Sequence, residues 1–269
     1  MNFNEKTVVI TGASSGIGKA LAFEFSKAGA NVVLGARSYD SLKDIEAQIG
    51  SKAMAVACDV TCEDDCKKLI DAAIERFSSI DVLICNAGIS MRALFDDVDL
   101  KVLHKLMDVN FWGTVYCCKY ALPYIQKSKG SIVGVSSVAG VHGLPARTGY
   151  SASKYAMTGF LETIRIENLK KGVHVMVAMP GFTASNVRLS SLTADGTSQG
   201  QSPRKEEKMM SAEQVAKIIA KGVKGRKRHL LMEFQGRATW IIKKIAPAFL
   251  DKLFFNHMAK EEDSPILNS

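Results

Sequence analysis

Long apolar runs, cysteines and a signal-like start are all scarce in this sequence, and each absence argues against a class of protein. No stretch of about 18 uninterrupted apolar residues occurs, which argues against a membrane-spanning helix. The first residues, MNFNEKTVVITG, lack a basic flank followed by a long apolar segment, so we expect no secretory signal. Six cysteines in 269 residues are too few for a disulfide framework. Hydrophobic residues, in contrast, make up 47%, which excludes a largely disordered chain and predicts one sizeable core.

The cysteines also lack a metal-binding pattern. Cys58, Cys62 and Cys66 are spaced by four residues, and no histidine lies near them in sequence. Zinc sites usually combine closely spaced cysteines with further Cys or His ligands. We therefore expect reduced structural thiols and no metal.

Positive charge is unevenly distributed along the chain. The formal net charge is +8, and residues 203–269 hold 14 Lys or Arg against 8 Asp or Glu, a net of +6. The first 202 residues are nearly neutral, at +2. A basic segment of this kind is compatible with nucleic acid, an anionic membrane surface or a solvated face.

Short apolar runs alternate with amphipathic stretches over the first 180 residues. The runs are Lys6–Ile10, Asn31–Ala36, Ala53–Cys58, Asp81–Cys85, Ser131–Ser136 and Val173–Ala178. Nearly continuous apolarity is typical of strands covered on both faces, and strand–helix alternation predicts a parallel sheet. Ser211 and Gln214 form a capping-box pattern that opens a last helix, before a short strand near Leu230–Met232. We predict a doubly wound α/β fold with helices on both faces, in one domain over residues 1–232.

A glycine-rich turn follows the first predicted strand and opens a helix. Its residues are Thr11, Gly12, Ala13, Ser14, Ser15, Gly16, Ile17 and Gly18. Glycines allow a tight turn and a close approach to a pyrophosphate, and a helix N-terminus supplies N–H donors. The strand before, the helix after and a second strand about 20 residues further on favour a dinucleotide site over a plain turn.

The second predicted strand is followed by a basic residue at the place where NAD-specific proteins usually have an acidic one. An Asp or Glu there would bind the adenosine ribose hydroxyls, but this chain has Arg37 and Ser38. A guanidinium can bind a 2′-phosphate through two hydrogen bonds, which a carboxylate would repel. We therefore predict NADP(H), with NAD(H) as the alternative and a solvated Arg37 as the simpler interpretation.

More motifs follow in a fixed order. They are Asp59-Val60, Asn86-Ala87-Gly88, Asn110, Ser137, Tyr150 and Lys154 in YSASK, and Pro180-Gly181 with Thr183. Together with the glycine turn, they make at least Lys6–Thr183 resemble the short-chain dehydrogenase/reductase family. NAGIS followed by GLPARTGYSASK is similar to the dehydrogenase/reductase member 7 branch, some of whose relatives act on lipids or steroids. The resemblance implies a Rossmann-type fold and a nicotinamide cofactor.

The resemblance also assigns residues to the cofactor. The expected contacts are Gly12, Ser14, Ser15, Gly16, Ile17, Gly18, Arg37, Ser38, Asp59, Val60, Asn86, Ala87, Gly88, Tyr150, Lys154, Pro180, Gly181 and Thr183. Asp59-Val60 would contact the adenine, and Pro180-Gly181 with Thr183 would hold the carboxamide. One residue departs from the pattern, because many NADP(H)-using members carry Lys or Arg in the turn where this chain has Ser15.

Ser137, Tyr150, Lys154 and Asn110 are the expected catalytic residues. Tyr150 and Lys154 are four apart, so on a helix they share one face. A phenol with a pKa of about 10 is a poor acid at neutral pH, and we expect the Lys154 ammonium to lower that pKa. Tyr150 would then protonate the developing alkoxide, to which Ser137 donates a hydrogen bond. The family implies that Lys154 holds the nicotinamide ribose and that Asn110 anchors a relay water.

The substrate is expected beside the same oxygen. Ser137 and Tyr150 would contact its carbonyl, and Met91, Leu144 and Phe182 are placed by family position to line an apolar pocket. His142 lies in the loop between Ser137 and Tyr150. It is either a substrate contact or a solvated loop histidine.

Residues 233–269 read as an amphipathic helical extension. Two apolar stripes, Trp240 to Ile245 and Phe249 to Phe254, flank Pro247 and are interleaved with lysines. Such a segment can pack on a second subunit, cover a pocket or lie on a membrane surface. Nucleic acid is not expected, because no binding module is recognisable.

The sequence therefore predicts an NADP(H)-dependent oxidoreductase that interconverts a carbonyl and a secondary alcohol on an apolar, keto-lipid or steroid-like substrate. The alternatives are an NAD-dependent alcohol dehydrogenase of the same fold and a nucleotide sensor without turnover. We expect a homodimer or homotetramer in the cytoplasm, with membrane contact through the extension as an option.

Overall fold

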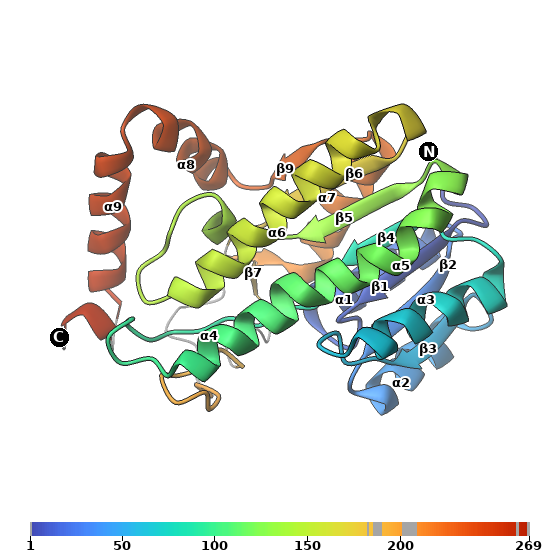
Figure 1. Cartoon of the computed structure of the whole chain (residues 1–269), viewed down its shortest axis with the longest axis horizontal. Coiled ribbons are helices and arrows are strands. Elements are labelled where there is room, and N and C mark those ends of the chain that lie inside the picture. The colour runs from blue at the N-terminus through green and yellow to red at the C-terminus, as the bar shows by residue number, and fades with distance from the viewer. Residues whose placement is uncertain (1, 182, 185–189, 201–208, 262–263, 268–269) are drawn as a thin grey trace.

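The computed structural model describes residues 2–181, 183–184, 190–200, 209–261 and 264–267, which fold around a parallel sheet (Figure 1). Its strands are β1 (Thr7–Thr11), β2 (Asn31–Ala36), β3 (Ala53–Ala57), β4 (Val82–Cys85), β5 (Ser131–Val135), β6 (His174–Met179) and β9 (His229–Leu231). They are ordered β3-β2-β1-β4-β5-β6-β9, and every neighbouring pair is parallel. The strand order reverses between β1 and β4, which is where such sheets bind ligands. The predicted doubly wound fold is confirmed.

Helices cover both faces of this sheet. They are α1 (Gly16–Lys27), α2 (Tyr39–Ile49), α3 (Glu63–Phe77), α4 (Leu100–Met107), α5 (Gly113–Ser128), α6 (Thr148–Glu167) and α7 (Ala212–Lys224). α1, α2 and α7 pack on one face, whereas α3, α5 and α6 pack on the other. A short second pair of strands, β7 (Thr183–Ala184) and β8 (Met210–Ser211), precedes α7.

The core alternates strictly along each central strand. In β1, Val8 and Ile10 pack toward α1 and α7, whereas Val9 between them packs toward α3 and α5. All three are fully buried. Burial on both faces explains why these strands are continuously apolar and rich in β-branched residues.

The start of α7 has the predicted capping box. Ser211 Oγ accepts a hydrogen bond from the Gln214 backbone N–H at 3.3 Å, and Gln214 Oε1 accepts one from the Ser211 N–H at 2.9 Å. The final strand β9 spans His229–Leu231, one residue earlier than predicted. It pairs with β6 and completes the sheet.

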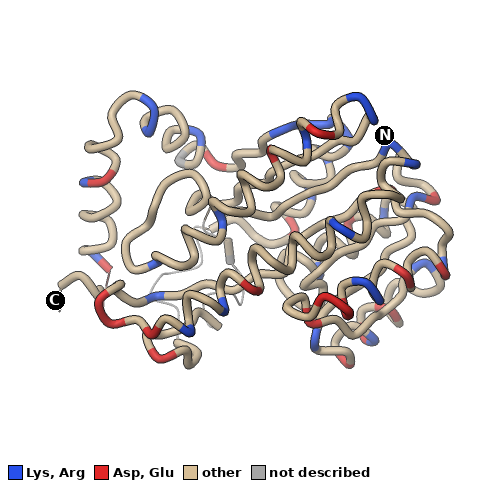
Figure 2. Tube along the Cα trace, in the orientation of Figure 1, with Lys and Arg blue, Asp and Glu red and all other residues tan. Residues whose placement is uncertain are grey.

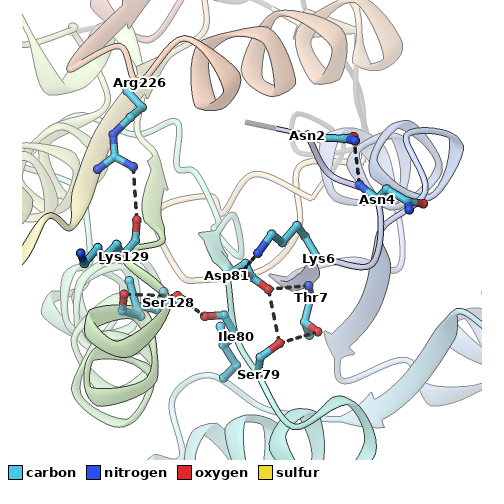
Figure 3. A network of polar contacts seen from close by, with 11 residues as sticks. Asn2, Asn4, Lys6, Thr7, Ser79, Ile80, Asp81, Ser128, Lys129 and Arg226 are labelled. Atoms are coloured by element: carbon cyan, nitrogen blue, oxygen red, sulfur yellow. Dashed lines mark hydrogen bonds and ion pairs between the residues drawn. The ribbon is translucent and has the colours of Figure 1, made fainter.

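A polar network joins the amino ends of the central strands (Figure 3). Asp81 is buried just before β4, where its carboxylate accepts hydrogen bonds from Lys6 Nζ at 2.9 Å and the Thr7 N–H at 3.0 Å. Nearby, Arg226 donates to the Lys129 carbonyl at 3.2 Å. A buried carboxylate requires such partners. This edge of the sheet is therefore closed by structural contacts, and the opposite, carboxyl edge is open for a ligand.

All six cysteines are free thiols, and five are buried, Cys62 being the exposed one. Cys85 and Cys118 lie with their sulfur atoms 4.0 Å apart in the core. The hydrogen bond with the Cys118 thiol, together with burial, raises the pKa of Cys85 well above its usual range. These side chains act as small apolar core residues.

The last helices, α8 (Phe234–Ile245) and α9 (Pro247–Ala259), form a bent extension at one end of the molecule (Figure 1). Pro247 occupies the first turn of α9, as expected for a residue that ends one helix and starts another. Leu250 and Met258 face inward and are buried. In the described parts of the chain, none of the helices combines the length and apolarity needed to cross a membrane.

Candidate active site

The glycine turn between β1 and α1 is locked by close backbone contacts. Gly12 and Gly16 have positive φ angles of 64° and 52°. Asn86, after β4, donates through Nδ2 to the carbonyls of Thr11 at 3.0 Å and Gly12 at 3.2 Å. Asn86 thus holds the turn to the neighbouring strand and does so at the switch point of the sheet.

Gly18 serves this turn from inside α1. A Cβ at Gly18 would lie 2.1 Å from the Gly12 carbonyl oxygen and 2.6 Å from Asn86 Nδ2. Both distances are shorter than an ordinary van der Waals contact. Gly18 therefore permits the close packing of turn and helix, and it does not line the cavity described below.

Replacing Gly18 by Ala is expected to destabilise the turn and weaken nucleotide binding together. Overpacking of this kind costs about 1–3 kcal/mol, and here the contacted atoms belong partly to the backbone. Urea unfolding and a titration of NADPH fluorescence measure the two effects. Gly159→Ala is the matched control, because a Cβ at Gly159 in α6 has no neighbour within 4 Å. An unchanged unfolding free energy and nucleotide affinity in Gly18→Ala would contradict this packing role.

A cavity of about 480 Å³ opens along the carboxyl edge of the sheet. The expected cofactor contacts that line it are Gly12, Ser14, Ser15, Gly16, Ile17, Arg37, Ser38, Asp59, Val60, Asn86, Ala87, Gly88, Tyr150, Lys154, Pro180, Gly181 and Thr183. The structure thus brings together residues from the ends of β1 to β6. A Cβ at Gly12 would lie 2.8 Å from the Ala87 Cα, so the turn leaves room for a ligand only because this residue is glycine, and the residues present fit a bound dinucleotide.

Arg37 and Ser38 stand at the end of this cavity, after β2. Both are exposed, and Ser38 is the residue that precedes α2. Within the described residues, Arg37 has no carboxylate partner. Its charge is therefore available to an anionic ligand group.

Ser137, Tyr150 and Lys154 meet at the other end. Ser137 follows β5 and caps a short helical turn, where its Oγ accepts the Ala139 N–H at 3.2 Å. Tyr150 and Lys154 lie one turn apart on α6, and Lys154 Nζ is 5.8 Å from the centre of the Tyr150 ring. Lys154 also donates to the Val135 carbonyl at 2.9 Å.

The electrostatics of Tyr150 correct one expectation. Burial raises the pKa of Tyr150, whereas a hydrogen bond with Ser137 and the charge of Arg147 act to lower it. The expectation that Lys154 brings the pKa of Tyr150 below its usual value is wrong in this structure, because desolvation outweighs the opposing influences. Burial also lowers the pKa of Lys154 to about 8. Its ammonium is thus only partly protonated above that pH.

Asn110 lies in a wide helical turn, Asp108–Trp112, between α4 and α5. Its side chain is fully buried, accepts the Ile89 N–H at 2.9 Å, and donates to the Ile89 carbonyl at 3.0 Å and Ser153 Oγ at 2.9 Å. Asn110 does not line the cavity. It holds the segment after β4 and part of α6. Gly88 lies between Asn110 and Lys154, because a Cβ added there would be 3.1 Å from Asn110 Oδ1 and 3.3 Å from Lys154 Nζ.

The structure places the expected substrate contacts in different surroundings. Leu144 lines the cavity, whereas Met91 does not and is fully buried in an apolar cluster with Val102 and Leu106. His142 lines an adjoining surface groove instead. Its Nε2 is 3.0 Å from Asp251 Oδ1, and its ring stacks on Phe254 of α9. His142 therefore joins the loop to the extension and is not a freely solvated histidine. Phe182 lies outside the described residues.

Sequence reasoning missed several cavity residues, which are Ser90, Lys105, Arg147, Leu192, Glu233, Gly236, Thr239 and Phe254. The last four come from the extension, which therefore forms part of the cavity wall. Arg147 is buried and donates to Ser90 Oγ at 2.6 Å and the Met91 carbonyl at 3.1 Å. Its position three residues before Tyr150 could have pointed to it.

Glu233 is the least expected of these residues. Its Oε2 would be 2.0 Å from a Cβ at Gly181, so its carboxylate lies against the segment assigned to the carboxamide. Burial raises the pKa of Glu233. Only the folded chain brings the start of α8 to this position.

Two further contacts hold the extension to the body. Lys243 of α8 donates to the Val141 carbonyl and approaches the Tyr155 hydroxyl. Arg92 and Glu261 form an ion pair at 3.3 Å, with both side chains only 8% exposed. The segment predicted to pack on the domain or on a partner therefore contacts the loop that leads to Tyr150.

Comparison with known proteins agrees with this geometry. Residues 6–195 match the family model described as short chain dehydrogenase. The chain is 34% identical to the "11-beta-hydroxysteroid dehydrogenase-like 2" of Arabidopsis thaliana over 259 residues, which cover 94% of this chain and 81% of the relative.

Solved structures show the same fold. A short-chain dehydrogenase/reductase from Burkholderia phymatum in complex with NAD has a TM-score of 0.82 at 22% identity, covering 93% of this chain and 96% of its own. An alcohol dehydrogenase from Thermococcus sibiricus complexed with 5-hydroxy-NADP has a TM-score of 0.71 at 24% identity, covering 84% and 93%. These neighbours bind either nucleotide, so the fold alone leaves the choice between NAD and NADP open.

Proposed function

We propose that this protein reduces a carbonyl on an apolar substrate with NADPH. The chain belongs to the short-chain dehydrogenase/reductase family and is therefore an oxidoreductase. The observation that carries this proposal is the convergence of Ser137, Tyr150 and Lys154 on one end of a dinucleotide-sized cavity. The reverse reaction, oxidation of a secondary alcohol, uses the same groups.

Each of these residues has a chemical task in the proposed reaction. Tyr150 donates its phenolic proton to the oxygen of the carbonyl, and Ser137 donates a hydrogen bond to the same oxygen, where charge grows in the transition state. Lys154, whose Nζ lies 5.8 Å from the centre of the Tyr150 ring, would supply positive charge near the phenolate that remains, while burial keeps the pKa of Tyr150 raised. The nicotinamide supplies the hydride when it is bound. Asn110 supports the arrangement through Ile89 and Ser153.

Arg37 supports NADP(H) over NAD(H). In the cavity it stands with Ser38 at the end of β2, where the adenosine ribose is bound in this fold. Two charge-assisted hydrogen bonds from a guanidinium match a 2′-phosphate. The residues directly after β2 are Arg37 and Ser38, and neither is the acid that usually accepts the ribose hydroxyls of NAD.

An apolar substrate is supported by the cavity wall beside Tyr150. Leu144, Val138, Leu192 and Phe254 line this part, and several relatives carry the name 11-beta-hydroxysteroid dehydrogenase. We infer a keto-lipid or a steroid-like ketone. The similarity to the dehydrogenase/reductase member 7 branch stays a prediction, as do the homo-oligomer and the division into a domain of residues 1–232 and an extension.

An activity screen tests the proposed function. Keto-lipids, steroids and small ketones are offered with NADPH and with NADH, and cofactor oxidation is followed by absorbance. We expect turnover with NADPH and the more apolar ketones. Nucleotide binding without turnover on any ketone would favour the sensor, and turnover with NADH alone would favour the NAD-dependent dehydrogenase.

A further inference from the structure

The outer face of the extension is unusually apolar for a protein surface. Of the fourteen large apolar side chains that are exposed in the described chain, seven lie between residues 234 and 267. We propose that this face docks on an anionic membrane surface. The docking face is formed by Phe234, Ile241, Ile245, Phe249 and Leu253.

The spacing of these residues aligns them. Phe234, Ile241 and Ile245 are separated by seven and four residues, so they form one stripe along α8, and they are 85%, 57% and 78% exposed. Phe249 and Leu253 are four apart on α9 and are 59% and 49% exposed. Large patches of this kind mark interaction surfaces.

Basic side chains accompany the stripe. Residues 234–260 contain five Lys or Arg and a single acid, Asp251, a net of +4. The acid faces His142, and Lys243 turns inward to Val141 and Tyr155. Arg237, Lys244 and Lys252 stay exposed, and Figure 2 shows this charge along α8 and α9.

The charge selects lipid over a second copy of the same face. Two such faces brought together would oppose like charges, which costs stability across an interface. An anionic lipid surface instead attracts each lysine and arginine while the apolar stripe enters the headgroup boundary. An apolar stripe flanked by exposed basic residues is therefore better matched to lipid.

The docking face also borders the way into the cavity. Leu144 and Phe254 line both the cavity and the surface groove between the 142–145 loop and α9. An apolar substrate dissolved in the membrane would reach Tyr150 along this groove. This consequence rests on the proposed function, whereas docking itself does not.

Co-sedimentation with vesicles tests the proposal without any substrate. The full chain is mixed with phosphatidylcholine vesicles that contain about 30 mol % phosphatidylserine, or none, at about 0.05 M and 0.5 M salt. We expect binding to the anionic vesicles that weakens at high salt. Because binding is the readout, failure of docking is separate from failure of the enzymatic proposal, which the activity screen decides.

Matched variants locate the contact. Ile245→Glu with Phe249→Glu, and Arg237→Glu with Lys244→Glu, should each lower vesicle affinity at least about tenfold. Ile166→Glu with Leu169→Glu is the control, because these exposed apolar residues lie in the last turn of α6 and just after it, and their replacement should leave affinity unchanged. NADPH binding measured on every variant checks that the fold is intact.

Three outcomes overturn the proposal. They are no binding to anionic vesicles, binding that none of the docking-face variants alters, and binding that the α6 control lowers as strongly. Sedimentation velocity adds a further arm. If the Ile245→Glu and Phe249→Glu variant converts a dimer into a monomer and vesicles are not bound, the face is a subunit interface.

Discussion

The Tyr150→Phe variant is expected to turn over ketone about 10³-fold more slowly than the wild type, because proton transfer by a positioned group contributes about 10²–10⁴-fold. Only the phenolic oxygen is removed, and the ring of Tyr150 keeps its packing on α6. Nucleotide affinity should change little. Steady-state kinetics with the best ketone of the activity screen, at saturating NADPH, measures the effect as a fall in kcat.

Tyr124→Phe is the matched control for this prediction. Tyr124 lies on α5, remote from the cavity, and its ring contacts Lys127. The same chemical change there should leave kcat unchanged. If Tyr150→Phe keeps near-wild-type turnover and a cooperative unfolding transition, Tyr150 has no part in the mechanism.

The protonation state of Lys154 beside Tyr150 depends on pH. Lys154 has a pKa of about 8, since burial disfavours its charged form. As the pH rises through that value, the ammonium loses its proton, and the positive charge that favours the phenolate of Tyr150 is lost with it. The sequence alone would have placed this pKa near 10.4, the ordinary value for lysine.

Arg37→Asp is expected to reverse the cofactor preference. Two charge-assisted hydrogen bonds to a phosphate are worth about 3 kcal/mol together, so the KM for NADPH should rise about 10²-fold or more. The KM for NADH should stay the same or fall, because a carboxylate at this place accepts the ribose hydroxyls. Kinetics with both nucleotides at fixed ketone concentration measures the change.

A variant elsewhere on the surface controls for charge alone. Arg76→Asp makes the same change on α3, where Arg76 is exposed and lies over Phe77, outside the cavity. It should leave the ratio of the two KM values unaltered. An Arg37→Asp variant that still prefers NADPH as strongly as the wild type would remove Arg37 from the nucleotide site.

The fold was predictable because its signals are local. The central strands of the sheet are buried on both faces, which favours continuous apolar, β-branched runs such as those of β1 and β2. The turn at Gly12 and Gly16 requires positive φ angles, and the capping box at Ser211 depends on a partner three residues away. Such requirements are visible within a few residues of sequence.

The cavity wall was less predictable because it is assembled from distant segments. Glu233 and Phe254 reach the cavity from α8 and α9, and no spacing in the sequence relates them to Tyr150. Met91 was expected at the substrate, but its side chain is fully buried among Val102, Leu106 and other residues of a small apolar cluster and does not line the cavity. Family position indicated a region of the chain and not the direction of a side chain.

By itself, then, the amino-acid sequence determined the doubly wound sheet, the nucleotide turn and the order of the motifs along the carboxyl edge. The tertiary structure alone decided the pKa values of the site residues and which segments enclose the cavity. Burial raises the pKa of Tyr150 and lowers that of Lys154, and Arg147 provides charge beside Tyr150. The net charge of +6 in residues 203–269 could likewise be interpreted only from the structure. Lys243 turns inward to the loop that leads to Tyr150, whereas Arg237 and Lys244 stay exposed. The reason is physical, because desolvation and charge depend on three-dimensional neighbours, whereas strand, turn and cap depend on neighbours along the chain.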